Sequence, residues 1–480
     1  MQSRNRSLFV SVVTLITAAL VLAGCGGGKA TVNGSLPMGT VNTSISDPPT
    51  CSSASGGPYQ HVYVTVRSVM VHQSATADAN AGGWQELAPG LANAPRQIDL
   101  LGNPSNQCFL AQLGAQQIAA GSYQQIRIIL LGNNQASQLT TNACGANAAN
   151  CVVLNPSGSV QPLQLSSEAN TGIKIPSGQI AGGRFTVPDG GVVDLNVDFD
   201  ACASIVAQPN GQFRLKPVLH AGEVSLQTNI ISGKVVDSAT SQPITGTTIV
   251  ALEQRDAATG VDRVIMQTLA DAQGNFSFCP VPEGAYDLVA VSISDTGVAY
   301  AATVTTGVTV GTAMGNIPMV AQTGANTTQG SITGQVSTAG ASGGVAADIT
   351  LAATQPLTIG GSSTLVTIPL VQQSSSTATL TTASDAACPA GTFCATYTVS
   401  VPAANPNVGA FSAGGTTYTQ DTANPVNYTM DALAFVPLSG STPDCSPSDV
   451  QVNTLQGGGA LAVTAGSSVT AATLAFTGCS

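Results

Sequence analysis

The chain has 480 residues, a formal net charge of −11 and only 8% charged residues, with 52 glycines and 26 prolines. This length allows about three domains of ~150 residues each. Acidic residues outnumber basic ones by 24 to 13, which argues against nucleic acid and anionic lipid headgroups as partners, because both favour clustered Lys and Arg. The many Ser, Thr, Ala, Val and Gly residues favour strands and turns, so we expect a mostly β protein.

Residues 1–24 predict a secretory signal. Two arginines precede an apolar run at residues 8–22, which is short for a membrane span of about 20 residues. The following sequence, Leu-Ala-Gly-Cys ending at Cys25, resembles the lipobox at which bacterial lipoproteins are lipidated and cleaved. The alternative is an ordinary signal peptide with a coincidental cysteine. We expect a lipid anchor at Cys25, and Gly26 in place of Asp favours the outer membrane by resemblance to known sorting rules.

The cysteines predict disulfides. Eleven cysteines less Cys25 leave ten, an even number, and export places them in an oxidising compartment. Two pairs flank tight loops and a third would tie the last strand to the body, so we predict the pairs Cys144 with Cys151, Cys388 with Cys394, and Cys445 with Cys479. Four cysteines stay unassigned: Cys51, Cys108, Cys202 and Cys279. The absence of any C-x2-C motif disfavours a metal cluster as the rival interpretation.

Residues 25–57 are rich in Gly, Ser, Thr and Pro and predict a flexible tether, with a first irregular strand as the alternative. Residues 58–226 form the first folded unit, which opens on the alternating strand "HVYVTVRSVMVH". Two short helices are expected in it. One is in "NQCFLAQLGAQQIAAG", and the other is in residues 201–208, where Asp200 would be the N-cap.

This first unit resembles a domain of unknown function that occurs in many bacterial lipoproteins. The resemblance rests on "VYVTVRSVMVH", "GGWQEL", "IDLL", the pattern Ala120-Gly121-x-Tyr123-x-Gln125-Ile126-Arg127, "VDFDACASIV" and "FRLKPVL" and covers most of residues 58–226. It implies a β-rich fold and brings no established activity with it.

Residues 227–322 resemble the carboxypeptidase regulatory-like family, which has a transthyretin-like β-sandwich grouped with starch-binding-like folds. The matching residues are Gly233, Val235, Asp237, Pro243, Ile244, Gly246, Asp271, Gly274, Phe276, Phe278, Pro282, Gly284 and Tyr286. The resemblance implies an accessory module for binding or spacing, with glycans as one ligand class. Residues 323–480 repeat its opening Ile-x-Gly-x-Val pattern and predict a third β-sandwich. The expected fold is therefore a row of tandem β-sandwich domains behind a lipoprotein signal peptide.

A polar set alternates with apolar residues in "VVDLNVDFD". Val193, Leu195, Val197 and Phe199 should face the core, which places Asp194, Asn196, Asp198 and Asp200 together on the opposite face. A row of oxygen ligands is one way to bind structural Ca²⁺. An outward acidic surface, with Asp200 as helix cap, is the interpretation we favour, because calcium needs six to eight converging oxygens.

Trp84 is the only tryptophan in the chain, and it is either a platform for stacking a sugar or an anchor in the core, which we favour. Ser342 lies in a literal G-x-S-x-G motif, but no histidine follows it in the chain, so a nucleophile elbow is disfavoured. A metal site shared by the three histidines is disfavoured. His61 and His72 lie an odd number of positions apart on one predicted strand, so they lie on opposite faces, and His220 is the third.

These features together predict a non-catalytic, membrane-anchored surface lipoprotein with modules for carbohydrate binding or adhesion. Its expected partner is a glycan or an envelope protein, and it needs no cofactor. Two alternatives stay open. One is a carbohydrate-active hydrolase with a cleft at Trp84 and a pair of aspartates, and the other is a structural spacer in the envelope.

Overall fold

The computed structural model describes residues 37–47, 58–102, 108, 110–165, 168–207, 211–224, 229–257, 259–345, 347–359, 362–370, 377–380, 388–420, 426–435 and 445–479. The expected signal peptide, Cys25, Cys51 and the side chain of Cys202 lie outside the described residues. Within the described ranges, no helix is long and apolar enough to cross a membrane.

The first module (residues 37–224) is built from two main sheets, and none of its described helices is longer than six residues. One sheet has four strands in the order β15 (Leu219–Glu223), β12 (Val192–Phe199), β1 (Met38–Ser46), β5 (Ala111–Ala119). The second follows the order β10 (Ile173–Ile175), β7 (Gln125–Leu130), β2 (Tyr59–His72), β8 (Cys151–Leu154), β9 (Val160–Gln164), β14 (Phe213–Leu215), β13 (Ile205–Ala207), with β3 (Gln85–Glu86) and β4 (Arg96–Asp99) also paired to β2. The remaining elements are β6 (Gly121–Tyr123) paired with β11 (Phe185–Val187), η1 (Pro89–Ala92), η2 (Asn133–Gln138), η3 (Ser177–Gln179), η4 (Ala181–Gly183) and α1 (Ala201–Ser204).

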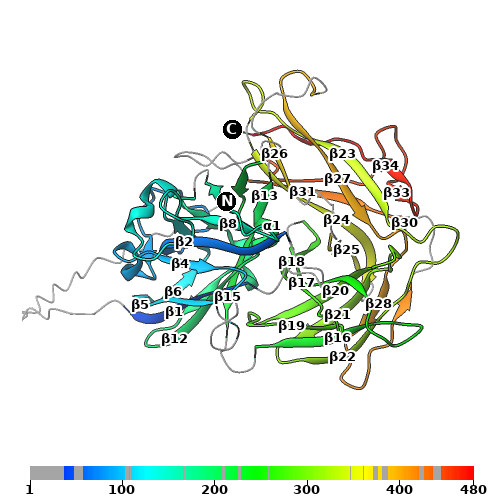
Figure 1. Ribbon diagram of the computed structural model, residues 1–480, viewed down its shortest axis with the longest axis horizontal. Helices are drawn as coiled ribbons and strands as arrows, with labels where there is room; N and C mark the ends of the chain where they lie inside the picture. Colours follow the sequence, from blue (N-terminus) through cyan, green and yellow to red (C-terminus); the bar gives the residue numbers. More distant parts are fainter. Residues whose placement is uncertain are drawn as a thin grey trace, which may run out of the picture. The chain divides into compact units, whose positions relative to one another are not determined.

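Of the expected tether at residues 25–57, the structure describes residues 37–47, and these contain strand β1, which corrects the tether there and confirms the alternative of a first strand. It pairs in parallel with β12 and antiparallel with β5, so it is an inner strand of its sheet (Figure 1). Val41 and Ile45 are fully buried in the core of the first module. Two apolar side chains on one face are enough here, because both edges of β1 are hydrogen-bonded.

The two helices expected in this module are also largely strands. β5 occupies most of the segment in which the first helix was expected, and it buries Leu113 and Ile118. A side chain at Gly114 would lie 3.0 Å from Ala88, so the glycine allows η1 to pack closely against this strand. The second helix is the single turn α1, and the chain then continues as β13.

The second module (residues 229–322) and the third module (residues 330–479) are made of strands alone among the described residues. A three-stranded sheet has the order β19 (Asn275–Phe278), β16 (Ile231–Asp237), β22 (Ala313–Met319). An eleven-stranded sheet has the order β29 (Thr419–Gln420), β28 (Asn407–Ala410), β21 (Thr303–Thr309), β20 (Ala285–Ser294), β17 (Gly246–Arg255), β18 (Val261–Leu269), β25 (Ser362–Ile368), β24 (Ala347–Ile359), β31 (Thr429–Phe435), β32 (Asp449–Val452), with β26 (Thr377–Leu380) on β24. The others are β23 (Gly330–Thr338) with β27 (Phe393–Val401), β34 (Ser468–Thr470) and β35 (Leu474–Phe476), and the pair β30 (Val426–Asn427) with β33 (Ala462–Val463).

The eleven-stranded sheet runs through both modules, so residues 227–322 and 323–480 are not two independent sandwiches. β18 of the second module pairs in parallel with β25 of the third, and β21 pairs in parallel with β28. The core of the third module also includes Val289 and Val304 of the second. Residues 37–480 accordingly form one compact unit.

Four disulfides connect described cysteines. Three are the pairs predicted from spacing: Cys144–Cys151 and Cys388–Cys394, each with 5.6 Å between Cα atoms, and Cys445–Cys479. The fourth joins Cys108 of the first module to Cys279 of the second, and these two cysteines had no predicted partner. Their sequence separation of 171 residues explains why spacing alone could not pair them.

Candidate functional site

The polar set on β12 is buried, which corrects the expected outward acidic surface. Val193, Leu195, Val197 and Phe199 face the core as predicted, but Asn196, Asp198 and Asp200 are only 2%, 4% and 6% exposed. Asp194 is half-buried. The second module covers this sheet: its Gln267 donates a hydrogen bond to Asp200, and Pro282 lies against Gly222 of β15.

Local hydrogen bonds hold these polar side chains inside the sheet. Asn42 donates to Asp194 at 2.7 Å, Asn196 donates to Ser46 at 2.7 Å, and Ser46 donates to Asp198 at 3.3 Å. The hydrogen bonds run between β1 and β12, whose side chains are neighbours in a parallel register. Much of the hydrogen-bonding capacity of this polar set is therefore taken up by other side chains of the protein.

Burial also keeps these acids from acting as free ligands. It raises the pKa of Asp47 well above its usual value, and the charges of Asp200 and Asp198 raise it further. Burial and Asp200 likewise raise the pKa of Asp198. Within the described part of the chain, no three His, Cys, Asp or Glu residues are grouped so that they could hold a metal ion. The Ca²⁺ alternative at Asp194, Asn196, Asp198 and Asp200 therefore gains no support.

The histidines do not converge. His61 pairs through Nδ1 with Asp99 at 2.7 Å, and the remaining contacts of Asp99 are backbone N–H groups of residues 62 and 101. His72 contacts Trp84 instead, and His220 is half-buried on β15, where desolvation lowers its pKa to about 4. Within the described ranges, no hydroxyl or thiol hydrogen-bonds to His61, so this pair lacks the nucleophile that would make it a catalytic dyad.

Ser342 does not lie in a nucleophile elbow. It is in a tight turn that the bridge between Gly340 and Gly343 closes, and the chain continues into β24 rather than a helix. An elbow requires a strand, a turn and then a helix. The G-x-S-x-G sequence therefore forms a turn between two strands and has no catalytic geometry.

A second acid group lies on neighbouring strands of the eleven-stranded sheet. Glu253 of β17 is opposite Asp287 of β20, and Asp262 of β18 shares a hydrogen bond with Asp287. Burial raises the pKa of Glu253 well above its usual value, and burial together with Asp287 raises that of Asp262 to about 7. Because Glu253 and Asp262 are 0% and 3% exposed, they are packed inside the protein rather than presented to a substrate.

Trp84 is neither a core anchor nor a free stacking platform, so both interpretations are corrected. It is half-buried beside β3, and its ring lies 4.6 Å from the guanidinium carbon of Arg127. The His72 ring lies 5.1 Å away, and the indole N–H donates to the Asp78 carbonyl at 2.9 Å. The guanidinium occupies a ring face that a sugar would need, so Trp84 holds Arg127 in place through a cation–π contact.

Arg127 is a buried cation with little compensation. It lies in β7 between Met70 of β2 and Lys174 of β10, and is 6% exposed. Its Nη1 donates to the Thr171 carbonyl at 2.8 Å, while Nε is buried without a hydrogen-bond partner. Burial lowers its pKa, and the more distant charge of Asp78 opposes this. Within the described ranges, no carboxylate forms an ion pair with it.

Arg127 lines a cavity of about 320 Å³. The other lining residues are Met70, Ala79, Asn80, Ile129, Asn170 and Thr171. An apolar floor with a few converging polar groups is the usual make-up of a small-molecule site. The sequence analysis missed this site, although one signal was present: a single arginine in the apolar strand "QIRIIL".

Residues 38–217 match the family model described as a domain of unknown function, DUF4382. The match agrees with the lipoprotein-domain resemblance at residues 58–226, begins earlier so that it includes β1, and contains the whole Arg127 cavity. It does not extend to residues 227–322, where the carboxypeptidase regulatory-like resemblance stays a prediction. No curated protein matches the chain.

Several solved structures are similar to this chain at low scores. The Bacillus anthracis TIE protein is 8% identical to this chain, with a TM-score of 0.16. The matched region covers 92% of this chain and 51% of the TIE protein chain. The minor pilin GBS52 of Streptococcus agalactiae is 9% identical with a TM-score of 0.16, at 52% and 96% coverage. The shaft pilin SpaA of Lactobacillus rhamnosus GG is 9% identical with a TM-score of 0.17, at 60% and 99% coverage. The chain spans about half the length of the first of these, and such scores carry no argument about function.

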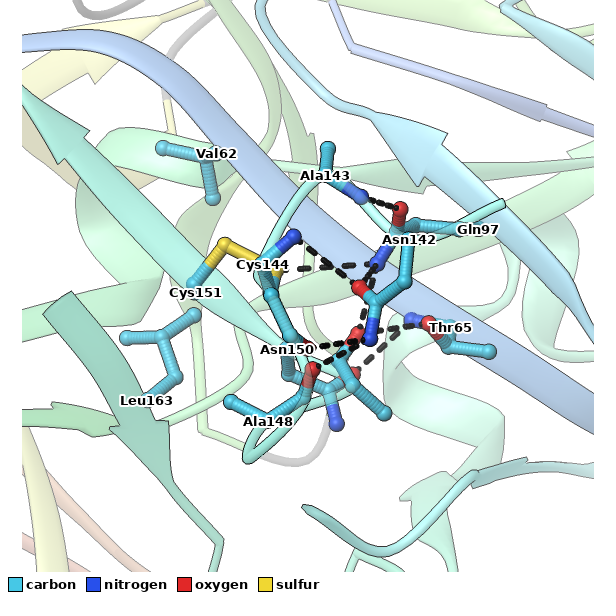
Figure 2. Close-up of a disulfide and its surroundings, with 12 residues drawn as sticks. Val62, Thr65, Gln97, Asn142, Ala143, Cys144, Ala148, Asn150, Cys151 and Leu163 are labelled. Atoms are coloured by element: carbon cyan, nitrogen blue, oxygen red, sulfur yellow. Dashed lines mark hydrogen bonds between the residues drawn. A yellow bond between two sulfur atoms is a disulfide. The ribbon is translucent and has the colours of Figure 1, made fainter. Parts of the chain in front are cut away.

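The DUF4382 region also contains a loop, residues 144–151, that is held by a disulfide and side-chain hydrogen bonds. The Cys144–Cys151 disulfide closes it, and Asn150 lies fully buried beneath (Figure 2). Asn150 accepts a hydrogen bond from the Thr65 backbone at 2.8 Å and donates to a carbonyl at 2.8 Å, while Gln97 donates to Asn142 at 2.9 Å. The polar groups of this loop use their hydrogen bonds within the protein, so the loop has a structural role in holding β2 and β8 together.

Proposed function

We propose that the protein is a non-catalytic, membrane-anchored surface lipoprotein whose first module binds a glycan in the Arg127 cavity. One observation carries the binding proposal. A buried guanidinium, fixed by Trp84 and without an ion pair among the described residues, lines a cavity of about 320 Å³. Keeping an uncompensated charge buried is costly, so its place beside a cavity supports a role in recognition.

The anchor and the location rest on the sequence. The lipobox-like segment ending at Cys25 supports lipidation, and Gly26 supports the outer membrane. Fractionation of cells that express the full chain should find it in the outer membrane. A Cys25→Ser variant should be released from that membrane or keep its signal segment. Equal membrane retention and processing of both forms would contradict a lipid anchor.

The binding proposal is tested with the soluble mature chain, from which residue 25 and the signal have been removed, on an array of bacterial and host glycans. We expect retention of at least one glycan class, with no change in the glycan after incubation. Arg127→Met should abolish retention, and Arg184→Met, at an exposed arginine of the same module, should not. Binding to no glycan, or equal binding by both variants, would contradict the proposal, and released sugar would favour the hydrolase instead.

A further inference from the structure

We infer that the Arg127 cavity recognises a single acidic sugar, a uronate, through its carboxylate. This inference rests on the proposed function and adds the chemical class of the ligand. Three observations lead to it: the charge balance around Arg127, the size of the cavity, and the chemistry of its rim.

The charge balance is clearest when the buried Arg127, 6% exposed, is compared with the partly buried Arg263, whose side chain is 15% exposed. Arg263 receives three carboxylates: Asp256 at 3.1 Å, Asp431 at 2.8 Å, and Asp449. Arg127 receives one carbonyl and a tryptophan face, although the chain has 24 acidic residues and 13 basic ones. A carboxylate is the group that a guanidinium binds most favourably, because two parallel N–H···O bonds match its geometry.

Free donors are present for such a contact. Nη1 uses a hydrogen bond to the Thr171 carbonyl, and Nη2 makes none to any described residue. The guanidinium carbon lies over the Trp84 ring, 4.6 Å from its centroid, and this cation–π contact restrains the group. Trp84 is therefore a positioning residue, and Arg127 is the residue that would contact the ligand.

The size and the rim of the cavity favour a sugar acid over other anions. A volume of about 320 Å³ is at the lower end of the roughly 300–1,000 Å³ range of ligand pockets, which suits one ring. Met70 and Ile129 offer apolar surface to the C–H face of a ring, and the exposed amides of Asn80 and Asn170 can bind hydroxyl groups. Inorganic phosphate has no apolar face, and an acidic peptide side chain has no hydroxyl groups for the amides.

The chain contains its own reporter for the test. Trp84 is the only tryptophan, so the intrinsic tryptophan fluorescence comes from the residue stacked on Arg127. We would titrate the soluble mature chain with sodium glucuronate and with glucose at matched ionic strength. We expect a saturable change in fluorescence with glucuronate. Its apparent Kd should be at least about tenfold lower than that of glucose, because glucuronate adds one charge-assisted contact with Arg127.

Variants then assign the effect to the site. Arg127→Met should remove the preference for glucuronate, and the matched control Arg184→Met should keep it. Asn170→Ala changes an exposed residue of the rim, so it should not disturb folding. It should weaken the binding of glucuronate and of glucose by similar factors. Circular dichroism of each variant checks that it has folded.

The possible results separate the inference from the proposed function. Equal affinity for glucose and glucuronate, or an unchanged preference in Arg127→Met, would overturn the uronate while leaving glycan binding intact. Tighter binding of N-acetylaspartate amide than of glucuronate would overturn it in favour of an acidic peptide. No saturable change with glucuronate up to about 50 mM, well above a millimolar Kd, would also overturn it. Failure of the proposed function would appear separately, as an array without any bound glycan.

Discussion

Replacing Arg263 with methionine tests whether the second and third modules are held together by charge. Arg263 extends from β18 to Asp431 of β31 and Asp449 of β32, and also contacts Asp256. Methionine keeps the apolar stem and removes the cation. Asp431, whose side chain is 2% exposed, would then be a buried carboxylate without its arginine.

The expected loss follows from burial. Breaking a buried ion pair by removing one partner costs about 3–5 kcal/mol. The Arg263 and Asp449 side chains keep 15% and 16% exposure, so solvent screens part of the effect. We therefore expect the free energy of unfolding to fall by about 3 kcal/mol at pH 8. Arg184→Met, at an exposed site, should change it by no more than about 0.5 kcal/mol.

The loss should depend on pH with a definite sign. Burial and the charge of Asp431 raise the pKa of Asp449 to about 6 even with Arg263 present, and without Arg263 it should rise further. A carboxyl whose pKa is higher in the folded state is stabilising below its unfolded pKa, and that stabilisation is lost as the pH rises through the folded pKa. The cost of Arg263→Met should therefore be smaller at pH 5 than at pH 8.

Urea unfolding followed by circular dichroism measures both values. A companion variant that combines Arg263→Met with Asp431→Asn and Asp449→Asn should recover most of the loss, because the two less exposed carboxylates are then neutral and only Asp256, whose side chain is 28% exposed, loses its contact with Arg263. A loss below about 1 kcal/mol at pH 8, the size of an exposed pair, would refute the argument. So would equal losses at pH 5 and pH 8.

Two further predictions concern crosslinks and buried acids. Replacing Cys108 and Cys279 by alanine should lower the free energy of unfolding by about 3 kcal/mol more than replacing Cys144 and Cys151. The disulfides close loops of 171 and 7 residues, and the entropy that a crosslink removes from the unfolded chain grows with the logarithm of loop length. Equal losses of unfolding free energy in urea would count against this entropic explanation. The pKa of Asp262, raised to about 7 by burial and Asp287, makes the folded state less stable as the pH rises from about 4 through 7. Asp262→Asn should therefore lose less thermal stability than the native chain between pH 5 and pH 8, and an unchanged profile would contradict this.

The sequence predicts features that depend on local pattern. Alternation identifies the buried face Val193, Leu195, Val197 and Phe199, and short loops identify the close cysteine pairs. It also supports the mostly β architecture. Each of these needs information from only a few neighbouring residues.

Features made by distant segments were not predictable in this way. β1 has little hydrophobic alternation and becomes a strand because β12 and β5 bond to both of its edges. The polar face of β12 is buried because the second module covers it, as Gln267 shows by contacting Asp200. The Arg127 cavity combines segments of four separate parts of the chain, and the sequence alone does not bring them together.

The sheet shared by the second and third modules also limits how the chain can be divided. A truncated protein ending near residue 322 would leave β18 and β21 with unpaired backbone edges, since β25 and β28 belong to the removed part. It would also uncover Val289 and Val304, which are fully buried in the core of the third module. Long exposed edges beside apolar surface promote aggregation. The smallest soluble fragment of this half of the protein is therefore expected to contain both modules, and any exchange of parts between relatives would have to move them as a pair.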